Sequence, residues 1–395
     1  MIAAHVVWDQ RFTAYDFGQG HPMHPIRLAL THRLSTELGL LDHDDVQVAG
    51  ADPLDVAALS RIHTPDLIEA VQRLSTDPSA ARGQFGIGSA DTPAFPGMHA
   101  ASALACGATV AACDAVWSGA ALHGVNIAGG LHHAMPGAAS GFCVYNDIAL
   151  GIDSLLRRGV ERVVYLDLDV HHGDGVERIF ANDPRVLTIS LHQSGRTLFP
   201  GTGFATDTGG ASAPDSAVNV ALPAGTDDAG WLRAFDAVVP ALVKGFRPDV
   251  VVSQHGCDSH YRDPLAALNL TIEGMQAAYS WVHDLAHQHS AGRWVALGGG
   301  GYELVDVVPR AWSHLIGIAA HRPINPARAT PIRWRDWVQE RCAVSAPMSM
   351  GDRFGAAIHY GSFNDGYDPD DPVDAAIMAT RRAVFPGHGL DPFFD

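Results

Sequence analysis

Carboxylates and imidazoles gather in residues 167–174, directly after an apolar stretch with the sequence VVYL. Side chains on a strand alternate between its two faces, so Asp167, Asp169 and His171 are predicted to point the same way. Two carboxylates and an imidazole on one face can bind a divalent cation. A strand end with solvated charges is the plainer interpretation, but burying several carboxylates without a cation would be costly. The pattern therefore favours a metal site.

Asp258 follows a second apolar strand, predicted over residues 248–256. Together with Asp169 and His171 it supplies three protein ligands, the number that a catalytic zinc keeps while leaving room for water and substrate. Zinc lowers the pKa of bound water to roughly 7 and makes it a usable nucleophile. These residues predict hydrolysis with one catalytic zinc per chain.

A pair of adjacent histidines, His132 and His133, follows another short predicted strand. Such pairs are more often solvated or metal-bound, but beside a zinc they could move a proton, a step worth about 10²–10⁴ in rate. Each imidazole then needs an orienting carboxylate, and Asp167 and Asp174 are available. Tyr302 lies just after a strand end and can donate a hydrogen bond to a developing oxyanion.

Two other chemistries are less favoured by the sequence. The four glycines at residues 298–301 are not followed by Lys and Ser or Thr and do not match G-x-G-x-x-G, so a nucleotide site is disfavoured. Cys143 and Cys257 flank the predicted site and could be nucleophiles, although small buried cysteines explain them more simply.

Strands and helices alternate through most of the chain, and the strands are short and apolar on both faces, which predicts a parallel sheet covered by helices. Strands are predicted near residues 1–9 and over 125–130, 163–170, 186–192, 217–222, 248–256 and 293–297. The longer predicted helices cover residues 26–40, 100–118, 146–157, 231–245, 272–289 and 304–320. Ligands bind beyond the carboxyl ends of strands in open α/β sheets, so the polar clusters should converge in one crevice.

Arg27 lies at the start of the first of these helices, where its charge opposes the helix dipole. We therefore expect it to have another role, such as bracing a loop. A Gly- and Pro-rich loop over residues 83–97 contains Asp91 and suits a segment that covers a site.

The composition limits the possible partners. The 395 residues carry 26 Lys and Arg against 43 Asp and Glu, a formal charge of −17, which argues against nucleic acid but allows a basic peptide. Five cysteines without a C-x-x-C pair favour a reducing compartment. The first residues predict a strand rather than a signal peptide, and no uninterrupted apolar run of 18 residues predicts a membrane span. We expect a cytoplasmic protein; the oligomeric state stays open.

Six motifs together resemble the histone deacetylase superfamily, in the family's order and over about residues 5–320. They are GHPM at 20–23, GGLHH at 129–133, ASGFC at 139–143, DLDVHHGDG at 167–175, FPGTG at 199–203 and LGGGGY at 297–302. The extra C-terminal segment and the acidic body are similar to the bacterial acetoin-utilisation branch.

This resemblance implies an arginase/deacetylase-like α/β fold, a parallel sheet of about eight strands between helices. Residues 1–321 would form a single catalytic domain and residues 322–395 an appendage packed on it. The implied activity is zinc-dependent removal of acetyl or other short acyl groups from lysine side chains of proteins. Zinc would be bound by Asp169, His171 and Asp258, with His132 and His133 as the proton-transfer pair held by Asp167 and Asp174, and Tyr302 polarising the carbonyl.

The resemblance also implies a substrate tunnel and a second ion. Phe142 and Phe199 match the walls of the acyl-lysine tunnel, Gly141 adjoins them, Asp91 matches a rim residue that holds the substrate backbone, and Leu265 lies at the entrance. A structural potassium ion would bind Asp167, Asp169, His171, Ser190 and Leu191, partly through backbone oxygens.

Two departures from the family pattern and two rival functions bear on the interpretation. Pro264 replaces an arginine of inositol-phosphate-binding nuclear enzymes, which disfavours a role in a corepressor complex. Leu265 replaces the acidic gatekeeper of polyamine deacetylases, which favours protein lysine over an acetylpolyamine or another small amide. A binuclear manganese ureohydrolase would need a carboxylate where Gly173 stands. A non-catalytic acyl-lysine binder would be expected to lack Tyr302 or a zinc ligand, and all are present.

Overall fold

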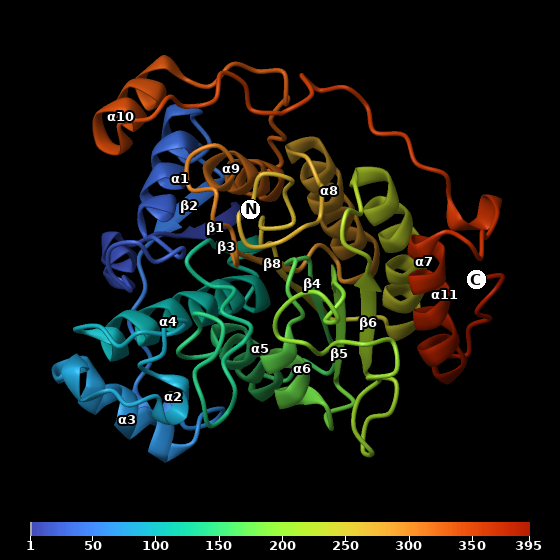
Figure 1. Cartoon of the computed structure of the whole chain (residues 1–395), viewed down its shortest axis with the longest axis horizontal. Helices are drawn as coiled ribbons and strands as arrows, with labels where there is room; N and C mark the ends of the chain where they lie inside the picture. The colour runs from blue at the N-terminus through green and yellow to red at the C-terminus, as the bar shows by residue number, and fades with distance from the viewer. Residues whose placement is uncertain (1) are drawn as a thin grey trace.

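Eight parallel strands form one sheet in the computed structural model, which describes residues 2–395 (Figure 1). Their order across the sheet is β2-β1-β3-β8-β7-β4-β5-β6. The strands are β1 (Ile2–Val7), β2 (Val46–Ala49), β3 (Ala121–Asn126), β4 (Val163–Asp167), β5 (Val186–Gln193), β6 (Ala217–Leu222), β7 (Val250–Gln254) and β8 (Trp294–Leu297). The predicted α/β sandwich with a parallel sheet of about eight strands is confirmed.

The central strands owe their burial to runs of apolar and β-branched residues. Every residue of β4, β5, β7 and β8 is buried. A parallel sheet needs cover on both faces, and continuous apolar strands provide the surface for it. The edge strand β2 has only one buried residue, Val46, which is why its short alternating sequence did not predict a strand.

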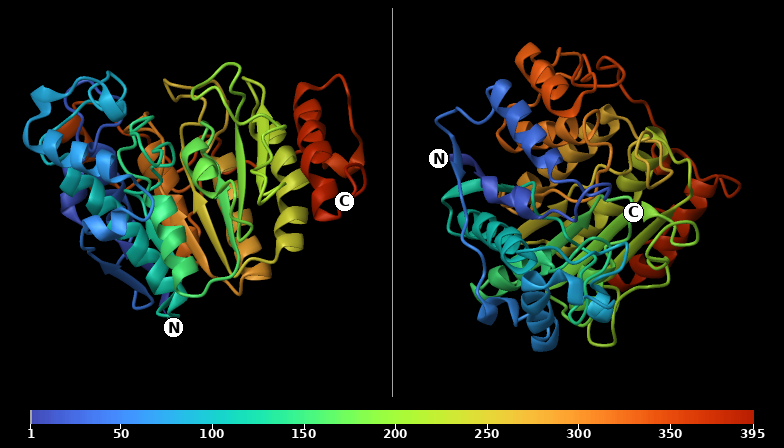
Figure 2. Two further views of the ribbon diagram at one scale, coloured as in Figure 1. Left: turned by 90° about the horizontal axis from the view of Figure 1, so that it is seen from below. Right: turned by 60° about the vertical axis from the view of Figure 1, so that its left-hand side comes forward.

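Helices cover both faces of the sheet (Figures 1 and 2). One layer contains α4, α5 and α6, with α3 packed outside α4; the other contains α1, α9, α8 and α7. The helices are α1 (Ile26–Glu37), α2 (Val56–Leu59), α3 (Pro65–Thr76), α4 (Met98–Trp117), α5 (Asp147–Arg157), α6 (Asp174–Phe180), α7 (Asp228–Phe246), α8 (Ile272–His289), α9 (Val308–Ala319), α10 (Ile332–Cys342) and α11 (Pro372–Val384). By length and composition α4 could cross a membrane, but it is mostly buried between the sheet and α5, as a core helix is.

The segment after residue 321 contains α10 and α11, which the sequence pattern did not predict. The indole of Trp334 in α10 is fully buried and donates to the Leu30 carbonyl of α1 at 3.1 Å. At the other end of the molecule α11 packs on β6 and α7, and Thr380 donates to the Asn219 carbonyl at 2.6 Å. The two helices therefore pack on the body at separate places.

Two predicted strands have a boundary that is wrong by three residues or more. The third strand spans 121–126 rather than 125–130, because the backbone turns after Asn126, where the Asn126 side chain accepts the Ala128 amide at 3.0 Å. The strand predicted over 163–170 ends at Asp167, because the backbone amides after it bond to carboxylates of the predicted site.

Candidate active site

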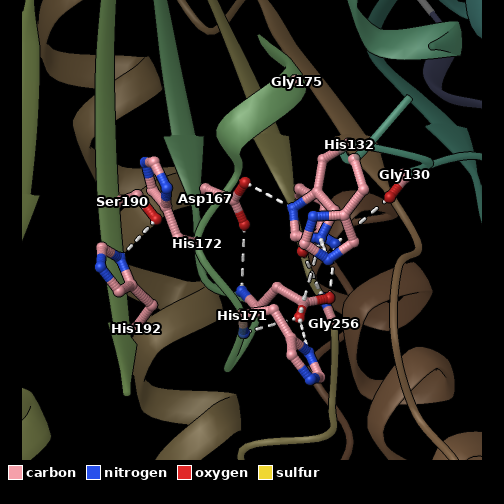
Figure 3. A network of polar contacts seen from close by, with 12 residues as sticks. Gly130, His132, Asp167, His171, His172, Gly175, Ser190, His192 and Gly256 are labelled. Carbon is pink, nitrogen blue, oxygen red and sulfur yellow. Dashed lines mark hydrogen bonds and ion pairs between the residues drawn. The ribbon is translucent and has the colours of Figure 1, made fainter. Parts of the chain in front are cut away.

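Four neighbouring strands deliver the predicted site residues to one edge of the sheet. His132 and His133 follow β3, Tyr302 follows β8, Asp258 follows β7, and Asp169 and His171 follow β4; these strands are adjacent in the order β3-β8-β7-β4. All strands are parallel, so their carboxyl ends lie at the same edge (Figure 3). The four polar clusters therefore meet at one edge of the sheet, as expected.

The loop after β4 corrects the prediction that Asp167, Asp169 and His171 share one strand face. Carboxylates, rather than a neighbouring strand, accept three successive backbone amides there. Asp169 N donates to Asp167 Oδ1 at 3.2 Å, Val170 N to Asp258 Oδ1 at 3.0 Å and His171 N to Asp169 Oδ1 at 3.0 Å. These hydrogen bonds take the amides out of the β-ladder, so the strand stops at Asp167 and the chain coils around the carboxylates.

Three buried donor groups converge beyond this loop. One ligand atom from each of Asp169, His171 and Asp258 lies within 4.8 Å of the others. His171 Nδ1 is 3.0 Å from Asp169 Oδ1 and 3.1 Å from Asp258 Oδ2.

The electrostatics of these three groups favour a cation. Burial on its own would lower the pKa of His171, but its hydrogen bonds to Asp169 and Asp258 outweigh burial and raise that pKa to about 10. Burial and the neighbouring charge of Asp169 raise the pKa of Asp258. Two adjacent carboxylates and one imidazole out of water are stabilised by a positive charge between them, so the donor set fits a divalent zinc-type ion.

His132 and His133 form a pair in which each ring has its own carboxylate. His132 Nδ1 is 2.8 Å from Asp167 Oδ2, His133 Nδ1 is 2.7 Å from Asp174 Oδ1, and the two Nε2 atoms are 3.0 Å apart. A carboxylate only accepts, so both Nδ1 atoms donate, and the two Nε2 atoms share one proton between them. The Tyr165 hydroxyl donates to Asp167 Oδ2 at 2.6 Å and fixes that carboxylate.

The two rings differ in pKa because their neighbours differ. Burial would lower the pKa of His132, but the charges of Asp167 and Asp169 outweigh it and raise the pKa to about 9. Burial and the neighbouring His132 lower the pKa of His133 to about 4. The pair therefore carries one positive charge at neutral pH, on His132, while His133 is neutral.

Two residues that the sequence did not point to hold these groups in place. Asp147, the first residue of α5, accepts the backbone amides of Gly130 and Leu131 at 3.0 and 2.7 Å and so fixes the turn before His132. Gln254 at the end of β7 donates to Asp169 Oδ2 at 2.6 Å. Asn146 before Asp147 is a recognisable helix cap, but only the fold shows what Asp147 binds.

The loop that carries Tyr302 is fastened from two sides. Arg27 Nη1 donates to the carbonyls of Gly299 and Gly301 at 2.8 and 3.2 Å, the bracing role expected of this arginine. Asp263 Oδ2 accepts the Tyr302 amide at 2.8 Å. A side chain on Gly300 would place its Cβ 1.9 Å from Asp258 Oδ2, so only glycine allows this approach. Burial raises the pKa of the Tyr302 phenol, which keeps its proton for donation.

The predicted substrate residues surround this centre. The Phe142 ring packs edge-on against Tyr302 with centroids 5.6 Å apart, and the Phe199 ring against His133 at 5.0 Å. Phe199 is 45% exposed, as a residue at an entrance would be. Two aromatic rings therefore line the approach to the polar centre from different loops.

The other predicted substrate residues, Asp91, Gly141 and Leu265, take part in two separate hydrogen bonds. Asp91 Oδ2 accepts the Gly141 amide at 3.0 Å, and Asp263 Oδ1 accepts the Leu265 amide at 3.0 Å. Their contacts with a substrate stay a prediction.

The residues predicted for potassium lie on β4, β5 and the loop after β4. Asp167 pairs in register with Ser190, next to Leu191 (Figure 3). His192 Nε2 donates to the Gly203 carbonyl at 2.9 Å, so its Nδ1 accepts the Ser190 hydroxyl at 2.8 Å. The Ser190 oxygen keeps lone pairs that could face a cation; the ion itself stays a prediction.

Cys143 and Cys257 are not suited to nucleophilic catalysis. Both thiols are buried, and burial raises the pKa of each well above its usual value. Because the thiolate is the reactive form, these side chains serve as small apolar groups beside the site.

Comparison with known proteins identifies the family of this arrangement. The model of the histone deacetylase domain matches residues 21–319. The chain is 39% identical over 351 residues to the acetoin utilization protein AcuC of Bacillus subtilis (strain 168), covering 88% of this chain and 89% of the relative. It is 37% identical to AcuC of Staphylococcus aureus (strain MSSA476) over 83% and 84% of the two chains, and 35% identical to AcuC of Staphylococcus xylosus over 88% and 90%. The branch predicted from the motifs is thereby confirmed.

Proposed function

This chain belongs to the histone deacetylase family, and we propose that it uses one zinc ion to remove acetyl or other short acyl groups from lysine side chains of proteins. One observation carries the proposal. The His132–His133 pair, with one carboxylate behind each ring, lies beside the three donor groups, with His132 Nε2 3.9 Å from Asp169 Oδ1. A proton-transfer device and a cation site therefore share one buried centre, as amide hydrolysis by activated water requires.

Asp169, His171 and Asp258 would hold the zinc, which supplies Lewis-acid polarisation and a low-pKa water when bound. His133 is neutral, so the pair can accept one further proton from the attacking water. His132 keeps the proton at its Nε2 because the charge of Asp167, which lies at its Nδ1, stabilises the protonated ring. The pair can then return a proton to the leaving lysine amine. The Tyr302 hydroxyl donates a hydrogen bond to the oxygen on which charge develops.

The ureohydrolase alternative lacks support in the donor set. A second metal would need a carboxylate where Gly173 stands, and a Cβ there would lie 2.1 Å from Asp167 Oδ2. The space is filled by the carboxylate that orients His132. We therefore propose a single catalytic ion at this centre.

The entrance favours lysine in a peptide over a polyamine. Leu265, which is partly exposed, offers no charge for the second amine of a polyamine. Phe142 and Phe199 offer apolar surfaces suited to the methylene stem of lysine. The charge of −17 attracts basic peptides.

Steady-state kinetics with two substrates test this choice. We expect kcat/KM for an acetyl-lysine peptide to exceed that for an acetylated diamine, and Leu265→Glu to shift the ratio toward the diamine. Ala267→Glu, a charge added at an exposed position two residues away, is the matched control and should leave the ratio unchanged. A wild-type preference for the diamine would refute the peptide assignment.

A further inference from the structure

Four histidines meet at the edge of the sheet opposite the site described above. His123 lies in the first half of β3, His283 and His287 lie one turn apart on α8, and His321 follows α9. His123 pairs with Trp294, the first residue of β8, whereas the deacetylase centre follows the last residues of these strands. The two clusters are therefore separated by the length of the sheet.

The four rings surround one point. The six distances between ring centroids range from 4.4 Å (His283–His287) to 5.4 Å (His287–His321), close to a regular tetrahedron. One nitrogen of each ring lies within 4.8 Å of the other three. His123 is buried, while His287 and His321 are exposed, so an ion from solvent can reach the cluster.

The hydrogen bonds of two rings fix a tautomer suited to a metal. His123 Nδ1 is 2.6 Å from the Ala319 carbonyl, which can only accept, so Nδ1 carries the proton and Nε2 has a free lone pair. That Nε2 lies 3.1 Å from His287 Nε2. Metal-binding histidines commonly donate their other N–H to a carbonyl or carboxylate in this way. Burial lowers the pKa of His123 to about 3, which keeps the ring neutral.

His283 repeats this arrangement. Its Nδ1 is 3.2 Å from the Asp284 carboxylate, which leaves Nε2 without a proton. This Nε2 is buried and has no hydrogen-bond partner among residues 2–395. A buried acceptor without a partner normally costs about 1–3 kcal/mol, and a metal ion bound to this nitrogen would remove that cost.

The backbone at His321 supplies an independent observation. His321, the second residue after the end of α9, has φ 57°, a left-handed position usually held by glycine. The hydrogen bond from Arg322 N to the Gly317 carbonyl at 2.7 Å and the ion pair of Arg322 with Asp45 hold the turn in place. The chain thus accepts a costly conformation at a position that brings a fourth imidazole to the cluster.

We propose that His123, His283, His287 and His321 bind one divalent transition-metal ion, Zn²⁺ above all, at a second site remote from catalysis. Neutral imidazoles suit zinc, copper and nickel, and they do not suit magnesium or calcium. Four protein ligands leave no open position, which marks a structural site. The ion would tie β3, α8 and the end of α9 together, at the residue from which the C-terminal segment departs.

Metal counting with matched variants tests the site. Metal-stripped protein is saturated with zinc, dialysed against zinc-free buffer and analysed for zinc per chain. We expect two equivalents in the wild type and one in His287→Ala, whose hydrolysis of an acetyl-lysine peptide should be unchanged. His289→Ala changes a histidine of α8 outside the cluster and should keep two. Equal zinc content in wild type and His287→Ala would overturn the proposal.

A second variant guards against a change in folding. His321→Gly removes a ligand but relieves the left-handed backbone, so the metal-stripped variant should melt no lower than the metal-stripped wild type. Zinc should raise Tm less in this variant than in the wild type, because only the deacetylase centre still binds. If zinc raised Tm equally in the wild type, His287→Ala and His321→Gly, the four histidines would not form a zinc site.

Discussion

His132 and His133 are adjacent and chemically identical, yet their surroundings drive their pKa values apart, to about 9 and about 4. The difference arises from position relative to carboxylates. His132 lies near Asp167 and Asp169, whereas His133 has Asp174 and the positive charge of its neighbour. A pair so arranged carries its one positive charge on His132 and keeps His133 neutral, as a group that first accepts a proton and then donates one requires.

Tyr302 acts at the same scale, through one hydroxyl group. Loss of an oxyanion donor typically costs about 10²–10³ in kcat, so Tyr302→Phe should lower kcat by that factor while KM moves little. The fold and zinc content should be unchanged, because the hydroxyl has no protein partner among the hydrogen bonds of residues 2–395. Tyr261→Phe, at a 44% exposed position, is the control. A Tyr302→Phe enzyme with wild-type kcat would exclude the proposed role.

Residues that carry the chemistry were easier to predict than those that position them. The sequence pointed to His132 and to both orienting carboxylates because such residues are crowded together: three Asp and two His lie within residues 167–174, and His132 and His133 are adjacent. Gln254 and Asp147 were not predicted because polar residues are common at the end of a strand and at the start of a helix, so their types carry no signal of a site. Their partners, Asp169 and the turn before His132, are 85 and about 16 residues away in the chain and meet them only in the fold.

At the scale of elements, strand ends and loops are shaped by the carboxylates that they present. The predicted end of β4 was three residues too late. The alternation of side chains along the sequence cannot show that the backbone amides of residues 169–171 bond to carboxylates instead of to a neighbouring strand. The strand β2 was missed because four residues with one buried side chain carry almost no pattern. Helices α10 and α11 were missed because the Pro-, Asp- and Gly-rich composition around them resembles that of a loop.

The contact of α1 with the glycine loop gives a prediction at this scale. Arg27→Met keeps an apolar stem but leaves the Gly299 and Gly301 carbonyls without a donor, so the free energy of unfolding should fall by about 1–3 kcal/mol. The loosened loop should lower kcat more than it raises KM. Arg33→Met, on the same helix, loses only a surface pair with Glu37 and should cost at most about 0.5 kcal/mol. Equal effects of the two changes, measured by denaturant unfolding and kinetics, would refute the bracing role.

The whole molecule contributes through its charge. A formal charge of −17 should attract basic peptides, and salt should weaken that attraction, since the screening length falls from about 30 Å at 0.01 M to about 10 Å at 0.1 M. We expect kcat/KM for a lysine- and arginine-rich acetyl-lysine peptide to fall across this range. An uncharged acetyl-lysine peptide of equal length should change little. Identical salt dependence of the two peptides would show that the overall charge does not guide substrate binding.

The central claim is that one zinc ion, held by Asp169, His171 and Asp258, serves the proton pair in amide hydrolysis. The most direct measurement is the zinc content and acetyl-lysine hydrolysis of Asp258→Ala beside the wild type, each stripped with chelator and then resupplied with zinc. The wild type should lose activity on stripping and regain it with zinc. Asp258→Ala should bind one equivalent less than the wild type and stay inactive at any zinc concentration. Full hydrolysis by a metal-free wild type, or by Asp258→Ala, would contradict the account.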